Sequence, residues 1–357
     1  MTAGAGAGDG DDDVVWADVL GRLMAGEDLT PDAVARVMST ILAGGATDAQ
    51  IAGFAVALRA KGETSDELAA LARTMVEFAE RVDVAEIEPL VDTCGTGGDG
   101  SGSVNVSTMA ALIAAGAGAK VAKHGNRAAS SRCGSADVLE ELGVVIDLAP
   151  AGVARCIREA GIGFCFAPRF HPAMRFAAGP RRELGVRTTF NFLGPLANPA
   201  GVRRQAVGVS DAAMAPRMVA ALATLGAERA LVFHGHDGLD ELTTTAASTV
   251  HELRDGSVRT YDVDPAALGL AAAAPADLVG GDAAANAAVV RRVLDGEAGP
   301  ARDIAVLNAA AALVVADLAA DLAEGLRGAV AAIDDGRAAA ALEAFVHVSA
   351  AAREDGN

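Results

Sequence analysis

Between residues 90 and 234 the sequence alternates between short apolar runs and segments with helical patterning, and this feature most restricts its possible folds. Strands are predicted at 90–94, 119–122, 144–148, 163–167, 206–209 and 230–234, with helices at 107–115, 135–142, 151–160 and 212–225. Strands that are apolar on both faces and joined through helices form a mainly parallel sheet with helices on both sides. Residues from 301 to about 352 are again predicted to be helical. The pattern therefore indicates an α/β domain with a central, mainly parallel sheet flanked by helices.

The first 85 residues have a different pattern, because helical spacing continues from Trp16 to about Val82 without a strand signal. We predict four short helices in this segment. Threonines that can cap a helix mark three of the starts, and two glycines mark helix ends. These signals are Thr30 with Pro31, Thr47 with Gln50, Thr64 with Glu67, Gly44 and Gly62.

The change of pattern indicates two structural units. We interpret residues 14–85 as a small all-helical N-terminal subdomain, and we predict that the polar, basic stretch 168–190 returns to it. Residues 86–167 and 191–357 would then form the larger α/β domain, with the ligand in the cleft between the two units. Residues 1–13 are rich in Gly and Asp and are predicted to be a disordered tail.

The net charge excludes some classes of partner. The 357 residues carry a formal charge of −18, so nucleic acid is not expected as a partner, because phosphate backbones require a basic face. No apolar run reaches the roughly 18–20 residues of a membrane helix, and the N-terminus does not resemble a secretory signal. We therefore expect a cytoplasmic protein with no membrane partner. The four cysteines lack a metal-binding spacing and are expected to be small buried hydrophobic residues.

A glycine-rich loop directly follows the predicted strand 90–94, with four glycines within the six residues from Gly95 to Gly100. Glycine lets the backbone adopt positive φ and approach a ligand closely, so that consecutive N–H groups can bind a phosphate. A tight turn is the alternative, and the loop is neither a dinucleotide-binding GxGxxG nor a Walker loop. The next segment, from Asn105 to Thr108, favours an anion site, because it begins a helix whose free N–H groups lie at the positive end of the helix dipole.

A second loop, from Lys123 to Arg132, follows the predicted strand 119–122. It combines several basic residues with an amide and two hydroxyl groups, which is unusual in a chain this acidic. Phosphate binding is the favoured interpretation, and a solvated surface loop is the alternative. His124 alone is weak evidence, because structural histidines are common.

The motifs closely resemble those of the anthranilate phosphoribosyltransferase family. DTCGTGGDG (92–100), NVST (105–108) and KHGNRAASS (123–131) are similar to its phosphoribosyl diphosphate (PRPP) site. GSADVLEELG (134–143), FAPRFHPAM (166–174), GPRRELGVRTTFNFLGPLANP (179–199) and GLDEL (238–242) follow in the family's order. The resemblance extends over nearly the whole chain from about Trp16 onward. One departure is Ser103, where the family usually has Thr, and the hydroxyl is kept.

The resemblance implies a set of site residues. It implies catalytic roles for Lys123, Asp240 and Glu241, metal ligation by Ser107, Asp240 and Glu241, and contacts to anthranilate from Gly95, Asn126, His171 and Arg181. The implied PRPP-binding residues are Gly95, Thr96, Gly97, Gly98, Asp99, Ser103, Asn105, Val106, Ser107, Thr108, Lys123, His124, Gly125, Asn126, Arg127, Ala128, Ala129, Ser130, Ser131 and Ser135. Adjacent carboxylates such as Asp240 and Glu241 suit Mg²⁺, and an arginine such as Arg181 can bind a carboxylate through two hydrogen bonds.

The resemblance implies transfer of the 5-phosphoribosyl group from PRPP to the amine of anthranilate, a step of tryptophan biosynthesis. It further implies Mg²⁺, with two ions per subunit, and a homodimer formed through the helical subdomain. A pyrimidine nucleoside phosphorylase would share the architecture, but the loop at 123–131 and the Asp240–Glu241 pair argue against it. A non-catalytic relative that binds nucleic acid is disfavoured by the charge of −18 and by the intact acidic pair.

Overall fold

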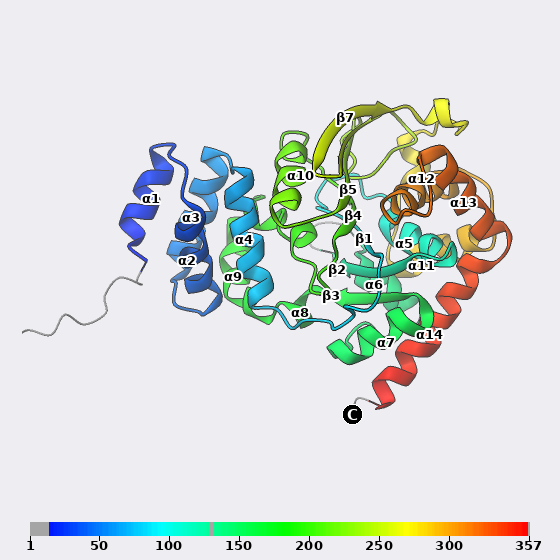
Figure 1. The fold of residues 1–357 in the computed structure, drawn as a ribbon, viewed down its shortest axis with the longest axis horizontal. Coiled ribbons are helices and arrows are strands. Elements are labelled where there is room, and N and C mark those ends of the chain that lie inside the picture. Colours follow the sequence, from blue (N-terminus) through cyan, green and yellow to red (C-terminus); the bar gives the residue numbers. More distant parts are fainter. Residues whose placement is uncertain (1–13, 129–131, 356–357) are drawn as a thin grey trace, which may run out of the picture.

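The computed structural model describes residues 14–128 and 132–355, so the predicted tail at 1–13 lies outside the described residues. A group of helices at one end of the molecule is followed by a larger domain built on a sheet (Figure 1). The helices of the first group are α1 (Trp16–Met24), α2 (Pro31–Leu42), α3 (Asp48–Lys61) and α4 (Ser65–Glu77). This arrangement confirms the predicted fold class, a small helical part with a larger α/β domain.

The predicted capping signals are confirmed. Thr30 accepts a hydrogen bond from the Ala33 amide at the start of α2, where Pro31 is the first helical residue. The side chains of Thr47 and Thr64 form capping boxes with Gln50 and Glu67 at the starts of α3 and α4. These side chains bind backbone N–H groups that have no partner inside the helix.

The sheet has seven strands in the order β3-β2-β1-β4-β5-β6-β7. The strands are β1 (Leu90–Gly95), β2 (Lys120–Gly125), β3 (Ile162–Phe166), β4 (Arg204–Gly208), β5 (Arg229–Gly235), β6 (Ser248–Arg254) and β7 (Ser257–Val263). Strands β1 to β5 are parallel to their neighbours, and β6 and β7 are antiparallel. The chain builds outward from β1 through β2 to β3 and then returns to β4 on the other side of β1. The strand order therefore reverses between β1 and β4, and open parallel sheets bind ligands beyond the carboxyl ends of the strands at such a point.

Helices cover both faces of the sheet. Alternate residues of β5 belong to different cores: Leu231 and Phe233 face one, Ala230 and Val232 the other. The first core is covered by α5 (Val106–Gly116), α6 (Ser135–Glu141), α7 (Pro150–Ala160), α11 (Ala283–Leu294), α12 (Pro300–Val315), α13 (Leu322–Asp334) and α14 (Arg337–Asp355). The second core lies under α10 (Ala215–Thr224) and is continuous with the helices α1 to α4.

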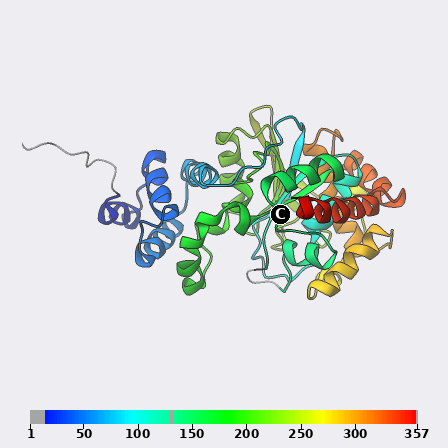
Figure 2. The same ribbon diagram turned by 90° about the horizontal axis from the view of Figure 1, so that it is seen from below.

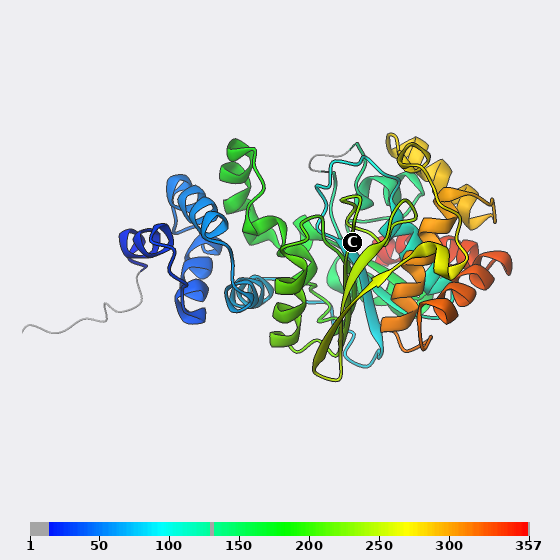
Figure 3. The same ribbon diagram turned by 90° about the horizontal axis from the view of Figure 1, so that it is seen from above.

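The stretch that was predicted to return to the helical part contains α8 (Ala167–Phe170) and α9 (Arg175–Leu184). Helix α9 packs against α2 and α3, and Figures 2 and 3 show this green helix beside the blue ones. The remaining short 3-10 turns are η1 (Pro172–Met174), η2 (Thr189–Asn191), η3 (Gly194–Leu196), η4 (Pro265–Leu268) and η5 (Pro275–Leu278).

Some sequence predictions were wrong. The run 144–148 is not a strand: Val144, Ile146 and Leu148 are buried alternately, but the Val145 amide donates to the hydroxyl of Ser349 on α14 and not to a strand. Strands β6 and β7 and helix α11 were not predicted. Helix α5 begins one residue before the predicted start at Ser107 and has Asn105 as its cap.

All four cysteines are buried, as predicted. In the part of the chain that the structure describes, no helix has the length and hydropathy needed to cross a bilayer.

Candidate active site

Three loops meet at the carboxyl ends of the central strands. The glycine-rich loop follows β1, the basic loop follows β2, and the loop after β5 carries Asp240 and Glu241. The first and third are in direct contact, because the Gly97 amide donates to Asp240 Oδ2 at 2.6 Å. The structure thus brings together residues that are 143 positions apart in the sequence.

Asp240 fits against two glycines that pair in register, Gly95 of β1 and Gly208 of β4. A Cβ on Gly208 would lie 1.6 Å from the Asp240 carbonyl oxygen, and one on Gly95 would contact the Asp240 carboxylate. The loop between β5 and β6, which carries Asp240 and Glu241, is called the acidic loop below. Only glycine leaves room for this loop to cross the ends of β1 and β4. Gly95 of the first motif therefore leaves space for the Asp240 carboxylate, in addition to making the loop flexible.

Lys123 lies below this loop with only 1% of its surface exposed. Its Nζ donates to the Thr93 carbonyl at 2.6 Å and to Ser107 Oγ at 3.1 Å. The hydroxyl of Thr93 in turn donates to the Ser107 carbonyl at 3.0 Å. The start of α5 is therefore tied to β1 and β2 by a buried ammonium group, which has three N–H donors and uses two of them here.

Burial dominates the electrostatics of the site. Burial raises the pKa of Asp240 to about 7, and the nearby charge of Asp99 adds to the effect. The pKa of Glu241 is also raised, by burial and by Asp240, although Lys123 partly opposes the shift. Burial lowers the pKa of Lys123, while Asp92 counteracts this change. Burial and the neighbouring carboxylates both disfavour the ionised forms of Asp240 and Glu241, and a bound cation would favour them.

Asp92 supports the basic loop from inside the sheet. It is fully buried, accepts the His124 amide at 3.1 Å, and accepts the Asn198 side-chain amide at 2.8 Å. Asn198 also donates to the Ala122 carbonyl at 2.8 Å. Burial raises the pKa of Asp92. This network fixes the end of β2 and was not assigned a role from the sequence, although Asp92 begins the first motif.

Two histidines pack together beside the basic loop. The ring centroids of His124 and His171 are 5.1 Å apart, and His124 Nδ1 donates to the Gly194 carbonyl at 2.9 Å. Burial lowers the pKa of His124 to about 3 and that of His171 to about 4. Both rings are therefore neutral at neutral pH. His124 Nε2 has no hydrogen-bond partner among the described residues.

Arg181 extends from the last turn of α9, with its guanidinium 5.8 Å from the centroid of the Phe190 ring. Burial lowers its pKa. Among the described residues no carboxylate forms an ion pair with it. An arginine that is desolvated without a carboxylate partner is suited to binding an anionic ligand.

Asn105 caps α5 without a side-chain bond to the helix. Its side-chain amide donates to the Cys133 carbonyl at 3.2 Å, and its Oδ1 accepts the Asn286 amide at 2.8 Å. The Asn105 side chain is therefore bonded to neighbouring segments and not to α5, whereas the Val106 and Thr108 amides donate to the carbonyls of Val104 and Asn105. Val106 and Thr108 are buried within α5.

The remaining predicted PRPP-binding residues lie at several places, and three of them are not among the described residues. The guanidinium of Arg127 pairs with Asp137 and Glu140 on α6, which commits its charge to carboxylates. Ser103 forms an isolated bridge with Val279. Ala129, Ser130 and Ser131 lie outside the described residues. The other predicted PRPP contacts lie on the glycine-rich loop, at the end of β2 or at the start of α6; they are Thr96, Gly98, Gly125, Asn126, Ala128 and Ser135.

One residue of the site was missed from the sequence. Arg187 donates to the Gly98 carbonyl at 2.9 Å and to Ser210 Oγ at 2.6 Å, so it joins the glycine-rich loop to the segment after β4. Its Cζ lies 5.3 Å from the centroid of the Phe192 ring. Arg187 falls within the motif at 179–199, where only Arg181 was assigned a contact.

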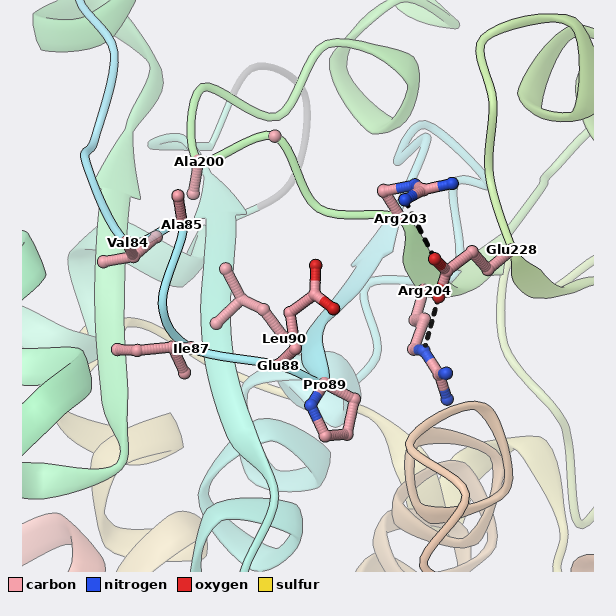
Figure 4. Close-up of a pocket in the computed structure, with 11 residues that line it drawn as sticks. Val84, Ala85, Ile87, Glu88, Pro89, Leu90, Ala200, Arg203, Arg204 and Glu228 are labelled. Atoms are coloured by element: carbon pink, nitrogen blue, oxygen red, sulfur yellow. Dashed lines mark hydrogen bonds and ion pairs between the residues drawn. The ribbon is translucent and has the colours of Figure 1, made fainter.

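A small cavity of about 60 Å³ lies at the opposite, amino ends of β1 and β4 (Figure 4). Leu90, Arg203, Arg204 and Glu228 are among the residues that line it, and both arginines pair with Glu228. Its volume suits one or two water molecules rather than a nucleotide-sized ligand. The motifs therefore point to the other edge of the sheet.

The acidic loop meets part of the requirement for a magnesium site. Asp240 and Glu241 are hard oxygen ligands, and Mg²⁺ is commonly bound by one or two carboxylates together with substrate phosphates and water. Among the described residues, no group of three His, Cys, Asp or Glu is arranged to hold a metal by itself. The donor set therefore fits an ion that is shared with a phosphorylated ligand.

Comparisons with known proteins identify the family of this chain. The glycosyl transferase family, a/b domain, matches residues 87–339, and the helical bundle domain of the same family matches residues 17–79. The anthranilate phosphoribosyltransferase of Roseiflexus castenholzii is 55% identical over 334 residues, which cover 93% of this chain and 98% of the relative.

Solved structures give the same result. Anthranilate phosphoribosyltransferase from Thermus thermophilus has a TM-score of 0.88 at 45% identity, covering 93% of this chain and 99% of that chain. The Saccharomyces cerevisiae enzyme in complex with PRPP and Mg has a TM-score of 0.86 at 26% identity, covering 94% and 98%. The chain therefore belongs to this glycosyl transferase family and, within it, to the anthranilate phosphoribosyltransferases.

Proposed function

We propose that this chain transfers the 5-phosphoribosyl group of PRPP to the amine of anthranilate, releasing pyrophosphate in tryptophan biosynthesis. The observation that carries the proposal is the contact of the glycine-rich loop with Asp240, beside buried Lys123 and the start of α5. This arrangement combines N–H donors, an ammonium group and carboxylates at one edge of the sheet. A diphosphate with a bound cation matches all three.

Within this proposal, the diphosphate lies against the glycine-rich loop and the start of α5. Asp240, Glu241 and the hydroxyl of Ser107 would hold Mg²⁺, with two ions per subunit. Burial, together with the charges of neighbouring carboxylates, raises the pKa of Asp240 and Glu241, and a bound cation would favour their ionised forms; this supports the assignment. Bound Mg²⁺ would neutralise the charge of the diphosphate as the bond to the ribose breaks.

The chain's own groups would stabilise the leaving pyrophosphate. Cleavage at the anomeric carbon places negative charge on the diphosphate and positive charge on the ribose. Lys123 is fixed by Thr93 and Ser107, and its buried ammonium acts more strongly than an exposed one. The N–H groups of the glycine-rich loop would bind the same diphosphate. Catalysis then rests mainly on positioning and electrostatics.

Anthranilate would bind between α9 and the basic loop, with Arg181 on its carboxylate and with Gly95, Asn126 and His171 nearby. The buried arginine without a carboxylate partner among the described residues supports this role. The amine of anthranilate is already a free base at neutral pH, so attack needs no strong general base. His124 and His171 are neutral and add no charge to the site.

We further propose a discontinuous helical subdomain in which residues 168–190 join 14–85, and a cytoplasmic homodimer formed through that subdomain. The packing of α9 against α2 and α3 supports the first part. The exposed apolar residues Val15, Met24 and Val56 on this part of the chain support the second.

The test is turnover of PRPP and anthranilate with Mg²⁺, followed by the loss of anthranilate fluorescence. We expect transfer to require all three components. Parallel reactions with a pyrimidine nucleoside and inorganic phosphate would detect a nucleoside phosphorylase. Absence of transfer to anthranilate by the folded protein would refute the proposal.

A further inference from the structure

A buried side chain, Asn308 of α12, is hydrogen-bonded to the acidic loop. Asn308 Oδ1 accepts the Leu242 amide at 3.0 Å, and its Nδ2 donates to the Leu242 carbonyl at 2.8 Å. The second Nδ2 hydrogen is donated to the Ile304 carbonyl at 2.9 Å. All the hydrogen-bonding capacity of the donor group is used, and two of the three bonds go to the residue that follows Glu241.

We propose that Asn308 is a positioning residue for the Asp240–Glu241 pair, and that it acts by fixing the backbone on the carboxyl side of the pair. The inference rests on the proposed function, in which this pair holds Mg²⁺. None of the sequence motifs described above contains Asn308, and it lies 66 residues from Leu242.

The surroundings of Asn308 argue for a specific role. It is 3% exposed, and all the other residues of α12 from Ile304 to Val315 are apolar and buried. A helix needs no amide at such a position, because an apolar residue would pack without the cost of burying a polar group. Fully bonded buried polar groups select one arrangement of the groups that they join.

The opposite side of the acidic pair is fixed as well. Asp237 Oδ1 accepts the Leu239 amide at 3.1 Å, and its Oδ2 accepts the Thr243 hydroxyl at 2.7 Å. Asp240 and Glu241 therefore lie between two fixed backbone positions, Leu239 and Leu242. The Leu239 carbonyl also accepts the Gly235 amide of β5 at 2.9 Å, whereas the two Asn308 bonds tie Leu242 to a helix that is distant in the sequence.

Helix α12 is well placed to link the parts of the site. It packs against α5, whose first turn carries Ser107, and it contacts β1, β4 and β5 (Figure 1). Asn308 therefore joins the backbone beside Asp240 and Glu241 to the same helix that packs against α5, at whose start Ser107 lies. Residues that orient metal ligands without touching the metal commonly contribute about 10- to 100-fold to metal affinity.

The test compares Asn308→Leu, which keeps the branching at Cγ and the number of side-chain heavy atoms but removes all three bonds, with Leu313→Ala. Leu313 lies on the same helix, is 2% exposed, and faces Gly328 of α13, so its truncation disturbs α12 without touching the acidic loop. Asn308→Ser is the second variant, and it carries the comparison if Asn308→Leu does not fold. Mn²⁺ binding in the presence of PRPP is measured by electron paramagnetic resonance, independently of turnover.

We expect Asn308→Leu to weaken Mn²⁺ binding by about 10- to 100-fold and to raise the Mg²⁺ concentration for half-maximal activity similarly. Its KM for anthranilate should equal that of wild type, and Leu313→Ala should change neither metal readout. Metal binding by the Asn308 variants that equals that of Leu313→Ala would overturn the inference alone. Wild-type protein that binds no Mn²⁺ with PRPP would overturn the proposed function together with it.

Discussion

Replacing Gly208 with alanine would test whether the place of Asp240 determines activity. The new Cβ would lie 1.6 Å from the Asp240 carbonyl oxygen, whereas such atoms are essentially never closer than 3.0 Å. The clash is with backbone, so a side-chain rotation cannot relieve it, and the acidic loop must move by about 1.4 Å. A displacement of roughly 1 Å in a reacting group can reduce the rate by about 100-fold. We therefore expect kcat/KM for PRPP to fall by about 100-fold or more.

The control for this variant is Gly163→Ala. Gly163 is also a strand glycine, and an added Cβ there would lie 2.7 Å from Ile157 Cγ1 and 2.8 Å from the Val153 carbonyl oxygen. It lies on β3, two strands away from β1. Both variants should lose about 1–3 kcal/mol of stability through overpacking, measured by urea unfolding. Equal kcat/KM in the two folded variants would refute the reasoning, because the loss would then follow stability and not the position of Asp240.

Three further predictions concern the charged and titratable groups. The double variant Asp240→Ala with Glu241→Ala should lose about 100-fold or more in turnover. Its Tm should be unchanged or raised, because burial disfavours both charges. A clear decrease in Tm would contradict this prediction. Arg181→Ala should raise the KM for anthranilate about 10- to 100-fold and leave the KM for PRPP unchanged, as steady-state kinetics would show. His124 and His171 have pKa values lowered to about 3 and 4, so the unfolded chain binds more protons below pH 6.5. Stability should be full above that pH and fall progressively toward pH 3, and replacing His124 with Gln should flatten this dependence in urea titrations.

The sequence was sufficient to predict the elements that local chemistry determines. The threonine caps of α2, α3 and α4 depend on residues three positions apart, and the structure contains all of them. The two loops were expected at strand ends because each glycine or basic cluster follows an apolar run. Parallel strands place their carboxyl ends at one edge, so the meeting of these loops also follows from the pattern.

The missed hairpin shows a signal that could have been used. Strands β6 and β7 are joined by Asp255 and Gly256, both of which have positive φ. An Asp-Gly pair in this setting is typical of a two-residue hairpin turn. The wrongly predicted strand at 144–148 has alternating burial, but its neighbours in space are helices. Alternating burial predicts a strand only if another strand is available to pair with it.

The positions of Asp240 and Arg187 depend on contacts that no local pattern contains. Asp240 is seated by two glycines that are neighbours only because β1 pairs with β4, and a single sequence does not reveal the register of strands more than 100 residues apart. Arg187 looked like one of several basic residues in its motif until the structure placed it on the Gly98 carbonyl. A glycine at a strand end has little meaning alone. Because the acidic loop crosses the ends of β1 and β4, Gly95 and Gly208 cannot be replaced there by residues with a side chain.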